Sequence, residues 1–230
     1  MELTFFLRAV AFTLWATLTT NVHAYESISI PSNITAGEET EFQLNMGYDL
    51  DDEDNKDIYG YRVYLAETPP GWGTGPVCWL AYQVPLSQKT VNVSIPADVA
   101  PDKTKIRISV SPLRKGSKRG SGYSYSNRAF LYGGNGTWSQ RQKDGWQMGD
   151  ADEVTCEAYG CVRDCYAKYY TGNKNRIDDG SGDGKARACV KQCLLATNPK
   201  DAGSAKVLSM PSRFMTGVVF GLVLVILHIV

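Results

Sequence analysis

Histidine is almost absent from this sequence, which contains two, His23 and His228, one near each end. If processing removes both terminal segments, as argued below, the mature chain has none. Ser-His-Asp and Cys-His nucleophiles, histidine general bases and histidine-containing zinc sites are then excluded. A copper centre at an N-terminal His23 is excluded too, because it would need a second histidine.

The sequence also lacks an excess of either charge. It has 24 Lys and Arg residues and 24 Asp and Glu residues, for a formal net charge of +0 at pH 7. This balance provides no general attraction to nucleic acid or to an anionic bilayer. We therefore expect no nucleic-acid partner, and no motif indicates a cofactor or a metal.

Long apolar runs occur only at the two ends. Residues 1–24 form an apolar segment with one arginine, Arg8, and finish in Val22-His23-Ala24. This small-x-small ending is typical of signal-peptidase cleavage, which would make Tyr25 the first mature residue. The alternative, an N-terminal anchor helix, is disfavoured because polar residues from Thr17 onward interrupt the apolar run.

The C-terminal apolar run, residues 214–230, ends with the chain. A spanning helix needs about 20 apolar residues and usually a basic cytoplasmic flank. Small residues and a polar spacer precede the run, as in a glycosylphosphatidylinositol (GPI) attachment signal. We assign residues 199–230 to this signal and its removed tail, with Gly203 as the acceptor and Asp201, Ala202 or Ser204 as alternatives. A single-pass helix is the other interpretation.

Short segments with alternating apolar and polar residues, separated by Gly- and Pro-rich turns, fill residues 25–132. One of them places Phe42, Leu44 and Met46 on one face, and another places Ile106, Ile108 and Val110 on one face. The predicted strands are 27–30, 41–46, 59–67, 77–84, 89–95, 105–110 and 123–132. We predict a mainly β fold, a seven-stranded sandwich of immunoglobulin or fibronectin type.

The following residues, 133–151, are polar and rich in glycine. Trp138 and Trp146 within them need apolar cover, which favours packing against the sandwich. A flexible linker is the alternative.

Residues 152–198 contain five of the six cysteines among helix-compatible residues. Cysteines four residues apart lie one turn apart on one helix face. Two antiparallel helices would then be joined by the pairs Cys161–Cys193 and Cys165–Cys189, leaving Cys78 for Cys156. Six cysteines allow many other connectivities. Oxidation of all six follows from secretion, and it disfavours a cysteine metal cluster.

Three sequons predict N-glycosylation at Asn33, Asn92 and Asn135. The acidic loop 49–57 offers oxygens for calcium but lacks fixed ligand spacing, which favours a solvated loop. The stretch 179–184 partly resembles an EF-hand loop, but Val190 stands where that loop has glutamate. Candidate ligand contacts are an aromatic in a Pro/Gly turn and a basic loop tip: Trp72, Arg114, Lys115, Lys118 and Arg119. For these, packing and a solvated loop are the respective alternatives.

A signal peptide, a single β-sandwich and a GPI tail together resemble secreted surface proteins of filamentous fungi. Two segments are similar to the necrosis-inducing secreted protein family of fungal effectors, Ile34-Thr35-Ala36-Gly37 and Val93-Ser94-Ile95-Pro96-Ala97-Asp98. The resemblance covers residues 25–132 and implies a cell-surface or apoplastic β-sandwich. The cysteine hairpin and the lipid tail depart from that family, whose members are released.

We therefore expect a GPI-anchored glycoprotein on the extracellular face of the plasma membrane or in the cell wall. Its expected activity is non-catalytic: adhesion, wall association or recognition of a partner, with a wall glycan or another surface protein as the ligand. The alternatives are an effector that engages host receptors and a carbohydrate-active enzyme with paired carboxylates.

Overall fold

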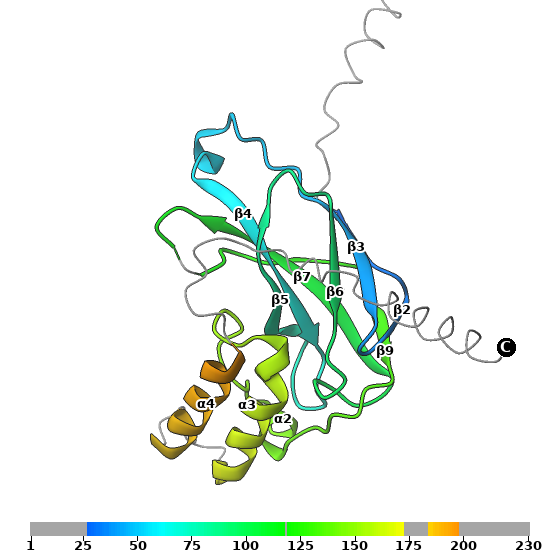
Figure 1. Ribbon diagram of the computed structural model, residues 1–230, viewed down its shortest axis with the longest axis vertical. Helices are drawn as coiled ribbons and strands as arrows, with labels where there is room; N and C mark the ends of the chain where they lie inside the picture. Colours follow the sequence, from blue (N-terminus) through cyan, green and yellow to red (C-terminus); the bar gives the residue numbers. More distant parts are fainter. Residues whose placement is uncertain (1–26, 118, 173–183, 198–230) are drawn as a thin grey trace, which may run out of the picture. The chain divides into compact units, whose positions relative to one another are not determined.

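The computed structural model describes residues 27–117, 119–172 and 184–197, all of which belong to one compact unit (Figure 1). Within these ranges no helix has the length and apolar character needed to cross a membrane. The predicted signal peptide, the GPI signal with Gly203, Lys118 and most of the EF-hand-like stretch lie outside the described residues.

The described residues contain nine strands, not the predicted seven. These are β1 (Ser27–Ser29), β2 (Asn33–Thr35), β3 (Glu39–Asn45), β4 (Ile58–Glu67), β5 (Gly75–Pro85), β6 (Thr90–Ser94), β7 (Thr104–Arg114), β8 (Ser124–Tyr125) and β9 (Ala129–Tyr132). β2 occupies a segment expected to be a turn, and the last predicted strand is divided into β8 and β9. Both additions are short strands, too short for periodicity to identify.

The strands form two sheets, as expected for a mainly β fold. The three-stranded sheet has the order β1-β3-β6 and the larger sheet the order β2-β9-β7-β4-β5, with β8 also paired to β7. All pairs are antiparallel except β2 with β9, which is parallel.

One hydrophobic core joins the two sheets. Phe42 and Leu44 from the smaller sheet belong to the same buried cluster as Ile106 and Ile108 from the larger one, and all four are at most 1% exposed. The predicted alternation in these two segments is therefore confirmed. Burial of each such side chain stabilises the fold by about 1.5–3 kcal/mol before the loss of conformational entropy is counted.

β4 is buried on both faces, unlike a strand with one solvated face. Tyr61, Val63 and Leu65 belong to the core, whereas Arg62 and Tyr64 alternate with them along the strand. The segment 133–151 packs against the same core, with Met148 in the buried cluster and Trp138 partly buried against it. It contains the helical turn α2 (Gln140–Lys143), which begins with a capping box between Ser139 and Gln142 and buries Arg141 and Gln142. Of the two interpretations of this segment, packing is therefore the one found.

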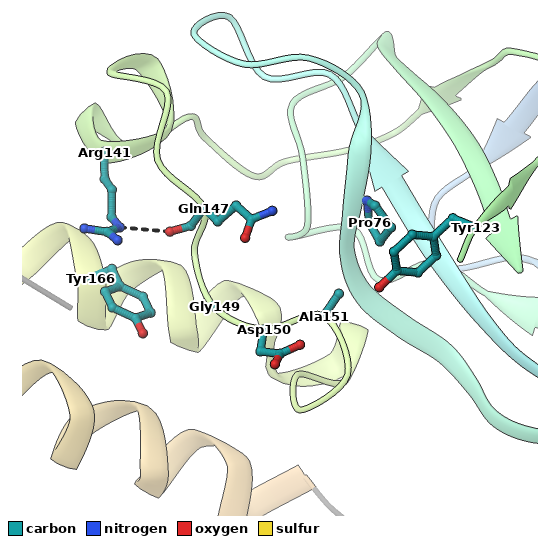
Figure 2. Close-up of a pocket in the computed structure, with 8 residues that line it drawn as sticks. All are labelled: Pro76, Tyr123, Arg141, Gln147, Gly149, Asp150, Ala151 and Tyr166. Atoms are coloured by element: carbon teal, nitrogen blue, oxygen red, sulfur yellow. Dashed lines mark hydrogen bonds between the residues drawn. The ribbon is translucent and has the colours of Figure 1, made fainter. Parts of the chain in front are cut away.

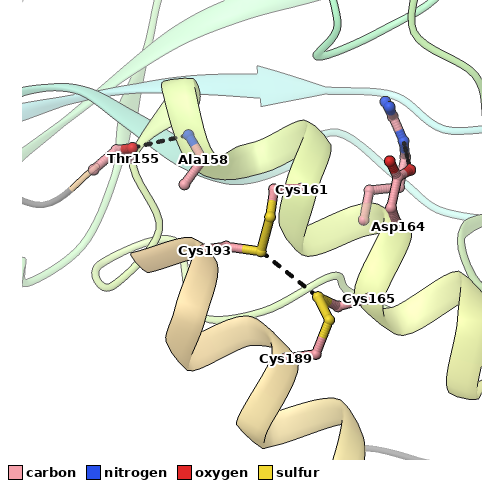
Figure 3. Close-up of a disulfide and its surroundings, with 8 residues drawn as sticks. Thr155, Ala158, Cys161, Asp164, Cys165, Cys189 and Cys193 are labelled. Carbon is pink, nitrogen blue, oxygen red and sulfur yellow. Dashed lines mark hydrogen bonds and ion pairs between the residues drawn. A yellow bond between two sulfur atoms is a disulfide. The ribbon is translucent and has the colours of Figure 1, made fainter. Parts of the chain in front are cut away.

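Two helices follow, α3 (Cys156–Tyr169) and α4 (Gly184–Thr197). Thr155 caps α3 by accepting a hydrogen bond from the Ala158 N–H at 3.0 Å (Figure 3). The disulfides Cys161–Cys193 and Cys165–Cys189 join the helices, with Cα–Cα distances of 5.8 and 5.7 Å. Cys78–Cys156 connects β5 to α3. The first two pairs are those that the helical spacing of the cysteines predicts, and the third joins the two cysteines that this spacing leaves over.

Candidate functional site

A pocket of about 410 Å³ lies between β5 and the segment that leads into α3. Figure 2 shows Arg141 and Tyr166 on one side of it, and Pro76 and Tyr123 on the other. The remaining lining residues are Gln147, Gly149, Asp150 and Ala151. The wall thus combines aromatic rings with a guanidinium, an amide and a carboxylate.

The segment that follows the lining residues Gly149, Asp150 and Ala151 is attached directly to β5. The Trp79 N–H donates to the Val154 carbonyl at 2.9 Å, and Trp79 forms an isolated parallel bridge with Thr155. The adjacent disulfide, Cys78–Cys156, fixes the same point covalently. Asp150 closes the preceding turn, because its carboxylate accepts the Asp152 N–H at 3.0 Å. The chain just after the lining residues Gly149, Asp150 and Ala151 is therefore held to β5 by a hydrogen bond and a disulfide.

Arg141 provides the positive charge of the pocket wall. Its guanidinium carbon lies 4.9 Å from the ring centroid of Tyr166 and 5.9 Å from those of Trp146 and Tyr170. Its Nε–H donates to the Gln147 carbonyl at 2.9 Å. Although only 6% of Arg141 is exposed, it lines the pocket. Cation–π contacts such as these stabilise a desolvated guanidinium.

The opposite side of the pocket contains Tyr123 and Asp150. The Tyr123 ring meets Tyr64 edge-on at a centroid distance of 5.4 Å. Burial, followed by the nearby carboxylates of Asp152 and Asp150, raises the pKa of the Tyr123 hydroxyl, which therefore remains protonated at neutral pH. Asp150 forms an ion pair with Arg119 at 3.0 Å, and Arg119 is largely exposed. Such a surface pair is easily exchanged for a ligand.

A buried ion pair behind the pocket connects β4 to the same turn. Arg62 Nη1 and the Tyr64 hydroxyl donate to Asp152 Oδ1 at 2.7 and 2.6 Å. Arg62 also donates from Nε to the Tyr82 carbonyl at 3.1 Å and stacks 4.1 Å from the centroid of that ring. Desolvation and the bond to Asp152 raise the pKa of Tyr64. Arg62, Tyr64, Tyr82 and Asp152 are called the Arg62 cluster below.

A second buried group, the Glu67 cluster, consists of Glu67, Tyr159, Arg163 and Gln142. Glu67 is fully buried, and desolvation raises the pKa of its carboxyl to about 8 although Arg163 and the Tyr159 hydroxyl favour the charged form. Neither Glu67 oxygen has a hydrogen bond of standard geometry among the described residues. Arg163 donates instead to the Asp98 carbonyl at 2.6 Å, and the Tyr159 hydroxyl accepts from Gln142 at 3.2 Å. Burial therefore outweighs both of these groups and keeps the pKa of Glu67 raised.

The predicted ligand contacts do not come together at one place. Trp72 is half-buried beside the core, with its ring 2.9 Å from where a Cβ on Gly75 would stand, as the packing interpretation expects. Arg114 forms an ion pair with Asp57 and donates to the Asp54 carbonyl. Of the members that the structure describes, Arg119 alone reaches a lining residue of the pocket, through Asp150. Lys115 is exposed.

In the acidic loop, carboxylates serve as local caps. Asp49 and Asp52 accept the backbone N–H groups of Asp51 and Asp54, each at 3.0 Å, and a short 3₁₀ turn, η1 (Glu53–Asn55), follows. Among the residues that the structure describes, the potential metal-ligand atoms that converge are the sulfurs of Cys161, Cys165 and Cys193. All three belong to disulfides, so they are not thiolate ligands.

All three sequon asparagines, Asn33, Asn92 and Asn135, are exposed. Their side chains are therefore accessible to modification.

The sequence does not match any protein-family model or any curated protein. The pocket itself was not predicted from the sequence. Its residues come from β5, the loop before β8, the segment 133–151 and α3, so that no local motif unites them. Trp146, which the sequence predicts to need apolar cover, has the Arg141 guanidinium of the pocket wall 5.9 Å from its ring centroid.

Proposed function

We propose that this protein is a GPI-anchored, glycosylated protein of the cell surface that acts by non-catalytic binding, with the pocket around Arg141 as its contact site. The proposal includes an immunoglobulin-like sandwich and kinship with fungal surface proteins. The observation that carries it is the pocket of about 410 Å³ with polar and aromatic lining residues, next to the point where the Cys78–Cys156 disulfide joins β5 to α3.

The groups around the pocket suit a polar ligand rich in hydroxyls, such as a cell-wall glycan. Tyr166 and Tyr123 offer ring faces and hydroxyls, Gln147 an amide, and Asp150 a carboxylate. Binding sites commonly combine aromatic walls with a few fixed polar groups that orient the ligand. The Cys78–Cys156 disulfide and the Trp79–Val154 hydrogen bond hold the chain next to the pocket in place. A ligand that binds there would therefore lose little affinity to the ordering of the protein.

Binding is better supported than hydrolysis. A glycosidase of the usual kind needs two carboxyl groups about 5–9.5 Å apart across the bond to be cleaved. Of the described residues that line the pocket, Asp150 alone has a carboxylate, and it is paired with Arg119. The effector alternative rests on the sequence resemblance and requires a released form of the protein.

A panel of wall glycans tests the binding site. The full-length protein from a eukaryotic secretory host should bind one glycan class without cleaving it, and Tyr123→Ala and Asp150→Asn should each weaken this binding roughly tenfold, as expected for about 1.4 kcal/mol. The matched control is Tyr59→Ala, which removes a tyrosine of similar exposure on β4 that does not line the pocket. Equal binding by all three variants would place the site elsewhere, and turnover of the glycan would favour the enzyme.

Treatment with a phosphatidylinositol-specific phospholipase tests the anchor. We expect it to release the protein from membranes, and mass spectrometry should find the chain ending near Gly203. An intact tail on a protein that needs detergent for extraction would support the single-pass alternative. A protein found only in the medium would support the effector alternative.

A further inference from the structure

The sequon Asn33-Ile34-Thr35 coincides with β2, the outermost strand of the larger sheet, which lies against β9 (Figure 1). In the parallel register Asn33 is opposite Phe130, and Thr35 is opposite Tyr132. Two backbone hydrogen bonds fix this register, from the Phe130 N–H to the Ser32 carbonyl at 2.9 Å and from the Ala36 N–H to the Tyr132 carbonyl at 2.8 Å. Residues directly opposite in a sheet point to the same face, so Asn33 and Phe130 are neighbours on the outer face.

Two aromatic side chains are exposed on this outer face. Phe130 and Tyr132 are 40% and 38% exposed, whereas Leu131 between them is 0% exposed and belongs to the core. Alternate residues of a strand are about 6.6 Å apart, so the two rings form a short row beside the sequon. On the other side of Phe130, the paired residue of β7 is the exposed Lys105.

We infer that the N-glycan of Asn33 folds back onto β9 and packs against Phe130 and Tyr132. The inference rests on the glycosylation included in the proposed function. The amide linkage places the first N-acetylglucosamine next to Phe130, where the C–H bonds on one face of the sugar pack against the negative face of the ring. Lys105 adds an ammonium donor for sugar hydroxyls. The row on β9 is thus a docking strip for the protein's own glycan.

Among the described residues, neither of the other two sequon asparagines is paired with an aromatic residue, so they provide internal controls. Asn92 on β6 is opposite Glu41 of β3, and its neighbours Thr90 and Ser94 are opposite Gln43 and Glu39. Asn135 follows β9 in a loop that bridges to Pro101. Glycans at these two positions should extend freely into solvent.

The test is the rate at which an endoglycosidase releases each glycan from the folded, full-length glycoprotein, followed by site-resolved mass spectrometry. In the wild type we expect release from Asn33 to be roughly tenfold slower than from Asn92 and Asn135. Phe130→Ala should remove this difference, and Phe130→Tyr, which keeps a ring, should retain it. Because the packed glycan would stabilise the fold through Phe130, Asn33→Gln should lower the melting temperature by about 2–4 °C in the wild type and not in Phe130→Ala.

Each outcome decides a different point. An Asn33 that carries no glycan overturns this inference together with the predicted glycosylation at that site, while the pocket and the anchor stand or fall by their own experiments. An occupied Asn33 whose glycan is released as fast as the other two overturns the inference alone. If Phe130→Ala is not secreted, the comparison among the three wild-type glycans and the Phe130→Tyr variant still decides it.

Discussion

The two buried clusters that begin on β4 differ in how their charges are satisfied. In the Arg62 cluster, the carboxylate of Asp152 receives hydrogen bonds from both Arg62 and Tyr64. In the Glu67 cluster, neither oxygen of Glu67 has a hydrogen bond of standard geometry among the described residues, and burial raises its pKa to about 8. A buried charge persists where it is paired and hydrogen-bonded, and a group without such partners is neutral instead. One strand therefore contacts the helical region through an ion pair at one point and through an uncharged acid at another.

Arg62→Met should have the largest effect on stability. It leaves the carboxylate of Asp152 buried without its cation, which typically costs about 3–5 kcal/mol. Urea unfolding of the oxidised protein at pH 7 measures the loss. Arg128→Met is the matched control, because Arg128 is exposed, and it should change stability by less than about 0.5 kcal/mol. Equal losses for the two variants would show that the ion pair does not stabilise the fold.

Glu67 should make stability depend on pH. Its pKa is 4.5 in the unfolded chain and about 8 in the fold, so the folded state binds more protons between these values. The contribution of Glu67 to stability is then fully present below pH 4.5 and is lost as pH rises to 8, by about 1.4 kcal/mol per pH unit where the folded group is protonated and the unfolded group is not. Unfolding midpoints of Glu67→Gln, measured from pH 5 to 9, should lack this decrease.

The exposed Glu39 offers a control for this measurement, because Glu39→Gln should follow the wild-type pH dependence. At pH 8.5 we expect Glu67→Gln to be more stable than the wild type, since it carries no charge into the buried site. A wild-type protein that becomes more stable from pH 5 to 8, relative to Glu67→Gln, would reverse our assignment of an uncharged acid.

Removal of one hydroxyl from each cluster sharpens the comparison further. Tyr64→Phe removes a hydrogen bond to a charged carboxylate, and such bonds contribute about 1.5–3 kcal/mol. Tyr159→Phe removes a hydroxyl that accepts from the neutral amide of Gln142, for which about 0.5–1.5 kcal/mol is typical. Chemical denaturation at pH 6, where Glu67 is protonated, should therefore find the larger loss in Tyr64→Phe. The opposite ranking would mean that the Glu67 cluster contains the stronger hydrogen bonds.

Local patterns in the sequence were enough to predict much of the fold. The period of two placed Phe42 and Leu44 inside, and Ile106 and Ile108 likewise. The four-residue spacing of cysteines predicted both helices and their bridges, because one helical turn brings such residues to the same face.

Contacts between distant segments could not be predicted in this way. Arg62 and Asp152 are separated by 90 residues, and each would be expected on the surface by composition alone. The pocket around Arg141 depends on the same long-range packing of the segment 133–151 against β5. β2 was not predicted, because a strand of three residues that pairs in parallel with a distant strand has no recognisable alternation of apolar and polar residues.

Thr155→Ala should have the smallest effect, because Thr155 belongs to neither cluster. It caps α3 through one hydrogen bond to the Ala158 N–H, and loss of such a cap costs about 1 kcal/mol. Thr155→Ser keeps the capping oxygen and should be close to wild type in urea unfolding. Since no hydrogen bond joins Thr155 to Tyr64 or Asp152 among the residues that the structure describes, its loss should add to that of Tyr64→Phe within about 0.5 kcal/mol in the double variant. A much larger loss of unfolding free energy in the double variant would mean that the start of α3 and the Arg62 cluster form one cooperative unit. The ion pair and the helix would then not be separate attachments to β4.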